Sequence, residues 1–146
     1  MLTVLALGAS VALTSCTAAA QVGVLHRGDA AVILIGRQCG DISYPREVSV
    51  GRVNGRDFGP AVWTIQADRP HAIPELPVGT VPDGYHTNVD DLHGAAVGRQ
   101  FWVRWKNGDE ELGGVPFDLS KIKDGSVMDS SGNVISRADF DKRYHC

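Results

Sequence analysis

The stretch GRQFWVRWKNG, residues 98–108, carries the clearest secondary-structure signal in the chain. Apolar and polar residues alternate along it with a period of two, which is typical of a strand with one buried face. The predicted inner face consists of Phe101, Val103 and Trp105, and the opposite face of Gln100, Trp102, Arg104 and Lys106. Asn107-Gly108 is a common hairpin-turn signal, so a second antiparallel strand is expected beyond it.

Three segments before this stretch give similar signals. Residues 30–35 form a short, continuous apolar run rich in β-branched side chains, which predicts a buried strand. Residues 47–53 alternate and lead into Asn54-Gly55, a second hairpin signal. Residues 60–67 predict another strand, with Trp63 on its apolar face.

Proline limits what two further segments can form. Residues 68–88 contain four prolines, which lack a backbone donor, so we expect a loop there with an edge strand around residues 76–81. Residues 115–119 alternate again, and Pro116 within them predicts a strand at the edge of a sheet.

The last part of the chain predicts a hairpin over residues 126–135 and one turn of helix over 137–142, with Ser136 as its N-cap. The short strands and frequent turn signals together predict an all-β fold. We expect a single antiparallel β-sandwich or barrel that follows an N-terminal signal segment.

Composition agrees with one folded domain and argues against one class of partner. The 146 residues are 43 % hydrophobic and 21 % charged, as in a globular protein. The formal net charge is −3, and no basic block stands out, so we expect no binding to nucleic acid. Seventeen glycines and seven prolines favour short strands joined by turns.

The N-terminal region is free of charge, because residues 1–25 contain no Asp, Glu, Lys, Arg or His. A transmembrane helix, a buried segment and a secretory signal are the possible interpretations. The strongly apolar part covers only residues 2–13, which is short for a membrane span of about 20 residues. A short apolar run followed by small residues favours a secretory signal, although no Lys or Arg precedes the run.

The run ends in Leu13-Thr14-Ser15-Cys16, which resembles the lipobox of bacterial lipoproteins. The resemblance implies that the signal peptide is residues 1–15, that it is cut before Cys16, and that Cys16 carries a diacylglyceryl group. It also implies an exported protein, anchored by lipid to the outer face of the cytoplasmic membrane or to the cell envelope. A diacylglyceryl group supplies two acyl chains, and stable anchoring needs both because a single chain binds a membrane only marginally.

The cysteine count is consistent with this resemblance. If Cys16 carries lipid, Cys39 and Cys146 remain, and in an oxidising compartment they can form a disulfide bond. Two free thiols in a cytosolic protein are the alternative. The predicted organisation is thus a signal peptide, a flexible tether over residues 16–29, and a β-sandwich-like domain over residues 30–146.

Two further segments, residues 61–65 and 77–85, resemble small exported lipoproteins of actinobacteria. That resemblance implies no catalytic residue. The sequence contains no Gly-x-Ser-x-Gly motif, and pairing with Cys146 would leave Cys39 without a free thiol for nucleophilic catalysis.

The densest polar cluster lies within residues 85–94. Imidazole and carboxylate groups bind Zn²⁺ and similar ions. The candidate metal ligands are therefore His86, Asp90, Asp91 and His93. Their spacing matches no tight motif, and a solvated loop is the alternative.

Trp102 and Arg104 are the candidate contacts for a partner or a sugar. An exposed Trp beside a cation suits such a surface. The alternative is that both faces of the sheet are covered, by the second sheet and by the proline-rich loop.

The sequence favours a membrane-anchored, non-enzymatic module of the cell envelope with a binding or structural role. Its expected partners are the membrane, through lipid on Cys16, and an envelope protein or polymer, and no cofactor is expected. The alternative is an exported metal-binding protein or metal-dependent enzyme that uses the cluster around His86.

Overall fold

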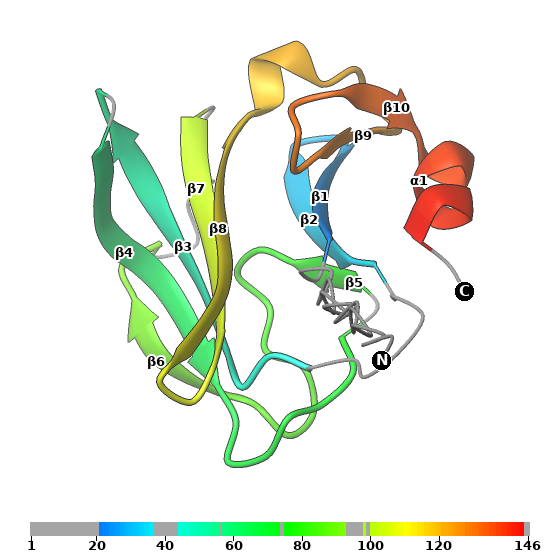
Figure 1. The fold of residues 1–146 in the computed structure, drawn as a ribbon. Coiled ribbons are helices and arrows are strands. Elements are labelled where there is room, and N and C mark those ends of the chain that lie inside the picture. Colours follow the sequence, from blue (N-terminus) through cyan, green and yellow to red (C-terminus); the bar gives the residue numbers. More distant parts are fainter. Residues whose placement is uncertain are drawn as a thin grey trace, which may run out of the picture.

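The computed structural model describes residues 21–36, 44–55, 57–73, 75–92, 98 and 100–144. These residues form two five-stranded antiparallel sheets that face each other, with a short helix on the outer side of one of them (Figure 1). The predicted all-β fold is confirmed, and the two separate sheets make it a sandwich rather than a barrel.

The first sheet has the strand order β10-β9-β1-β2-β5. Its strands are β1 (Val22–Arg27), β2 (Ala30–Ile35), β5 (Glu75–Pro77), β9 (Ser126–Asp129) and β10 (Val134–Ser136). β1 therefore lies in the middle of this sheet and pairs with β2 on one side and β9 on the other.

The second sheet has the strand order β6-β4-β3-β7-β8. Its strands are β3 (Glu47–Asn54), β4 (Asp57–Gln66), β6 (His86–Asp90), β7 (Gln100–Asn107) and β8 (Glu110–Asp118). The predicted hairpins β3–β4 and β7–β8 are both present, and each has glycine first in a two-residue loop. Gly55 and Gly108 adopt φ 65°, a conformation that glycine tolerates better than other residues.

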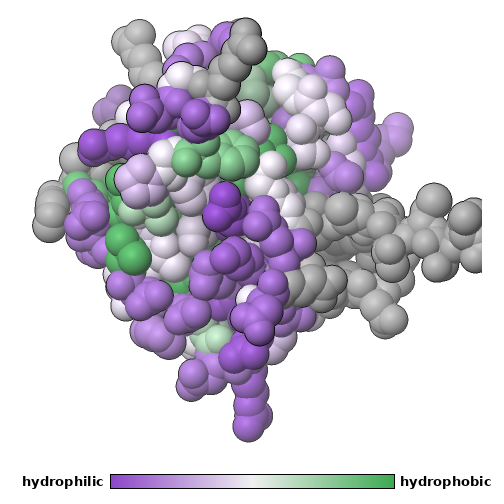
Figure 2. Space-filling model, turned by 60° about the vertical axis from the view of Figure 1, so that its left-hand side comes forward, coloured by the Kyte–Doolittle hydropathy of each residue, from purple (hydrophilic) through white to green (hydrophobic). Residues whose placement is uncertain are grey.

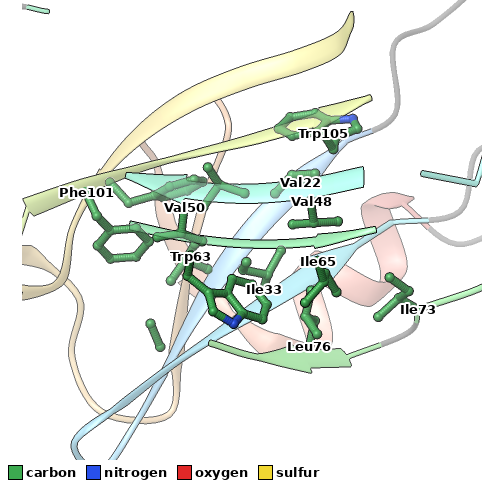
Figure 3. Packing of buried hydrophobic residues seen from close by; sticks show 14 of the residues in the cluster. Val22, Ile33, Val48, Val50, Trp63, Ile65, Ile73, Leu76, Phe101 and Trp105 are labelled. Atoms are coloured by element: carbon green, nitrogen blue, oxygen red, sulfur yellow. The ribbon is translucent and has the colours of Figure 1, made fainter. Parts of the chain in front are cut away.

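The main core lies between the two sheets. As the alternation predicts, Phe101, Val103 and Trp105 of β7 are all buried in it. β4 contributes Trp63 and Ile65, and Figure 3 shows these side chains among those packed between the strands.

A second, smaller core lies on the other face of the first sheet, where helix α1 (Arg137–Tyr144) covers it (Figure 1). Phe140 of α1 packs with apolar side chains of this sheet, namely Leu25, Val32, Leu34 and Val127. Both faces of β2 are thus covered, which is why its sequence is continuously apolar. Ser136 caps the helix as predicted, since its Oγ accepts a hydrogen bond from Asp139 N at 3.0 Å.

Two expectations about local structure are wrong. The flexible tether predicted over residues 16–29 is, from Val22 onwards, strand β1 and its turn, so the described part of the sandwich begins before residue 30. Because β1 continues the uncharged N-terminal run, no change in the sequence pattern marks where the strand begins. The polar cluster predicted as a loop is largely the edge strand β6, whose exposed polar side chains give no apolar alternation.

Within the described residues, no helix is long and apolar enough to cross a membrane.

Candidate functional site

Trp102 lies on the outer face of the second sheet, as the alternation predicts, and of the two interpretations it is the covered tryptophan, rather than the exposed one, that the structure shows. Only 3 % of its surface is accessible. Phe58 of β4 packs over it with ring centroids 5.7 Å apart, and the indole Nε1 donates a hydrogen bond to Gly59 O at 3.0 Å. The β3–β4 hairpin thus covers this tryptophan. The covering elements that the sequence suggested were instead the second sheet and the proline-rich loop.

Arg104 completes this outer cluster. Its guanidinium carbon lies 5.0 Å from the Trp102 ring centroid and 5.8 Å from that of Phe58, both within cation–π range. Its Nε lies 3.6 Å from a carboxylate oxygen of Glu111. The accessible parts of the cluster are therefore Phe58, which is 44 % exposed, and the partly exposed Arg104.

A polar network continues along the same face towards the start of β3. Thr64 Oγ1 donates to Ser49 Oγ at 3.0 Å. Glu47 accepts a hydrogen bond from Gln66 Nε2 at 3.1 Å and another from Ser49 Oγ at 3.3 Å. Strands β3 and β4 contribute these residues, and pairing in register places them side by side.

A cavity of about 300 Å³ lies at the end of this network. Two cations, Arg46 and Lys106, and two carboxylates, Glu47 and Asp109, line it together with Gln66. The Lys106 ammonium lies 4.0 Å from a Glu47 oxygen. Figure 2 brings the side of β3 and β4 forward and shows a largely hydrophilic face with small, separate apolar spots. This polar cavity suits a small charged group better than an apolar ligand.

The sequence did not identify this cavity. Its lining residues come from the start of β3 and the residue before it, the end of β4 and the residue after it, β7 and the β7–β8 turn, so they are far apart in the chain. The only available signal was the alternation that placed Lys106 on the outer face of β7.

The candidate metal ligands that the structure describes, His86, Asp90 and Asp91, are not gathered around one point. His86 begins β6 and Asp90 ends it, and four residues along a strand span about 13 Å, whereas zinc ligands lie about 2 Å from the ion. Asp91 follows the strand, and His93 lies outside the described residues. In the part of the chain that the structure describes, no three His, Cys, Asp or Glu side chains could hold one metal ion.

The predicted lipidation site Cys16 and the predicted disulfide partners Cys39 and Cys146 also lie outside the described residues. The nearest described residues along the chain are Gln21, Gly36 and Tyr144, which lie two to five positions from these cysteines and bear on both predictions below.

Burial and hydrogen bonds within the fold explain the shifted pKa values of Tyr85 and Glu75. Burial raises the pKa of Tyr85, whose hydroxyl donates to Pro45 O and lies 3.2 Å from His71 O. A side-chain hydrogen bond from Arg137 lowers the pKa of Glu75, with Arg27 contributing. Arg137 Nη1 lies 2.7 Å from Glu75, so this pair joins α1 to the edge strand β5.

Replacing Glu75 with Gln is expected to remove a pH-dependent part of the stability. Because the pKa of Glu75 is lowered in the folded protein, its ion pair stabilises above the unfolded-state pKa and is lost as the pH falls through the folded value. The effect should be about 0.2–1 kcal/mol, since Glu75 is 37 % exposed and water screens the pair. Melting temperatures of the two proteins should differ at pH 6 and converge once the pH is below the folded-state pKa of Glu75.

The matched control for this experiment is Glu111→Gln, which removes an exposed carboxylate that lies 3.6 Å from its cation. If both variants lost the same amount of stability with the same pH dependence, the ion pair between α1 and β5 would contribute no more to stability than an ordinary surface ion pair.

Comparisons with protein-family models, curated proteins and solved structures give no match for this chain. The function must therefore be argued from the sequence signal and the described surface.

Proposed function

We propose that this protein is an exported bacterial lipoprotein whose β-sandwich is anchored to the membrane by acyl chains on Cys16. The observation that carries the proposal is the place where the sandwich starts. Strand β1 begins at Val22, six residues after the cysteine of the lipobox-like Leu13–Cys16. Cleavage before Cys16 would therefore leave every described strand intact.

The proposed disulfide between Cys39 and Cys146 is supported by the contact of two nearby residues. A Cβ added to Gly36 would lie 2.6 Å from Tyr144 Cβ, so these residues are in contact. Cys39 is three residues beyond Gly36, and Cys146 is two residues beyond Tyr144. Each residue spans at most about 3.8 Å, so the two Cα atoms can approach to the 4.4–6.8 Å that a disulfide requires.

We further propose that the domain acts by binding a charged envelope component, and that the cavity beside Lys106 is the contact. Its two cations and two carboxylates offer partners for a ligand that carries both charges. The groups with shifted pKa values, among them Glu75 and Tyr85, do not line this cavity and are held in structural contacts, which favours binding over catalysis.

Intact mass spectrometry of protein extracted from membranes tests the anchor and the disulfide together. The expected mass is that of a chain that starts at Cys16 and carries acyl groups, with a gain of two hydrogens on reduction. Cys16→Ser is expected to move the protein out of the membrane fraction, whereas Cys39→Ser leaves it there. An unprocessed mass with three free thiols would contradict the proposal.

A further inference from the structure

The described residue nearest to the proposed lipid anchor is Gln21, and the structure fixes its position. Gln21 O accepts a hydrogen bond from Gly36 N at 2.8 Å, and its side-chain oxygen accepts one from Ser130 Oγ at 2.6 Å. Five residue steps separate Cys16 from Gln21, which is a reach of at most about 18 Å. An acylated Cys16 would therefore keep this end of the sandwich close to the bilayer.

The last turn of α1 lies at the same end. A Cβ on Gly36 would meet Tyr144 Cβ at 2.6 Å and Gln21 O at 3.3 Å, so Gly36 contacts both the anchor side and the helix. Figure 1 shows α1 ending beside the end of β2, in agreement with this contact.

This turn presents positive charge. Lys142 and Arg143 are both exposed, and the side chain of Arg143 is 53 % accessible. The carboxylate near Arg143 is Asp129, which is 3.8 Å away but only 2 % exposed and accepts hydrogen bonds from Ser131 N and Asn133 N. The two acids of the helix have partners of their own: Asp141 pairs with Arg137 at 2.9 Å, and Asp139 accepts a hydrogen bond from Ser136 Oγ at 2.7 Å. Lys142 makes no ion pair within the described part of the chain, and Arg143, although it lies near Asp129, keeps about half of its side chain open to an outside partner.

We infer that Lys142, Arg143 and Tyr144 form a contact surface for anionic phospholipid headgroups, which sets the orientation of the domain on the membrane. The inference rests on the proposed lipid anchor. Basic residues near a bilayer are attracted by its negative surface potential, and tyrosine is favoured at the membrane–water interface. The short reach from Cys16 holds both cations in the region where that potential acts, within about one Debye length.

The test uses the acylated protein, confirmed by intact mass, in vesicles of phosphatidylcholine alone or mixed with phosphatidylglycerol. Hydrogen exchange of the amides in the last turn of α1 is expected to slow on the anionic vesicles, by about fivefold for each cation that contacts them. High salt should reverse the protection. Lys142→Gln/Arg143→Gln should abolish it while the protein stays attached to the vesicles.

Lys121→Gln/Lys123→Gln is the matched control, because it removes two exposed cations at the other end of β1. Ile122 O accepts from His26 Nδ1 at 2.7 Å, and His26 lies about 13 Å along the strand from Val22. This variant should keep the protection of α1.

The outcomes separate this inference from the proposed function. Acylated protein whose helix exchanges equally fast on both kinds of vesicle would overturn the inference and leave the anchor standing. Loss of protection in the Lys121/Lys123 control equal to that in the Lys142/Arg143 variant would also overturn it, since net charge would then be the cause. Protein without acyl groups at Cys16 would overturn both.

Discussion

Trp63→Ala is expected to lower the free energy of unfolding by about 3–5 kcal/mol, the largest effect of any single substitution considered for this protein. Trp63 is 1 % exposed and is the largest side chain that is completely buried between the two sheets (Figure 3). Its removal leaves a cavity that the surrounding strands can fill only in part, so the lost contacts add to the lost burial of apolar surface. Urea unfolding, followed by circular dichroism, measures the change.

Phe58→Ala is the control for that experiment, because Phe58 is also an aromatic residue of β4 but is 44 % exposed. Its loss should cost about 1–2 kcal/mol, chiefly through uncovering Trp102. Equal losses from the two substitutions would mean that the inner and outer faces of β4 are assigned wrongly.

Gly113→Ala is expected to destabilise the protein by about 1–3 kcal/mol, whereas Gly114→Ala, at the next position of β8, should be close to neutral. A Cβ on Gly113 would lie 2.4 Å from Trp105 Cζ2, too close for any real contact, and that indole is buried in the core. A Cβ on Gly114 would meet nothing nearer than a Glu111 oxygen at 3.6 Å. Thermal melting of both variants measures the difference.

This pair of glycines tests the register of β8 against β7, in which Gly113 faces Trp105 and Gly114 faces Arg104. Shifting a strand by one residue moves every side chain to the other face of the sheet. If Gly114→Ala proved the damaging substitution and Gly113→Ala the tolerated one, the register would be wrong by one residue.

Alternation was a reliable guide wherever one face of a strand is apolar. It predicted β7 and β4 together with their inner faces, and turn residues predicted the hairpins that join β3 to β4 and β7 to β8. It missed β1, whose residues continue an uncharged run and look no different from it. It also missed β6, because an edge strand with polar side chains on both faces has no apolar period.

The surface could be predicted only in part. Alternation correctly placed Trp102 and Arg104 on the outer face, but it describes a single strand and cannot show that Phe58, more than forty residues earlier, covers the tryptophan. The cavity beside Lys106 depends on the pairing of β3 with both β4 and β7. The proximity of α1 to Gln21 likewise depends on tertiary contacts that leave no local pattern in the chain.

The two sheets differ in what covers their outer faces, and this difference has a consequence for sequence variation. Substitutions in β2 disturb one of two cores, since Ile33 packs towards the second sheet and Leu34 towards α1. Outer positions of the second sheet such as Lys106 and Glu111 lie outside both apolar cores, so substitutions there are expected to cost little folding stability. Libraries of variants intended to give this scaffold new specificities should therefore vary these positions and keep Trp102 and Phe58, which pack on the same face.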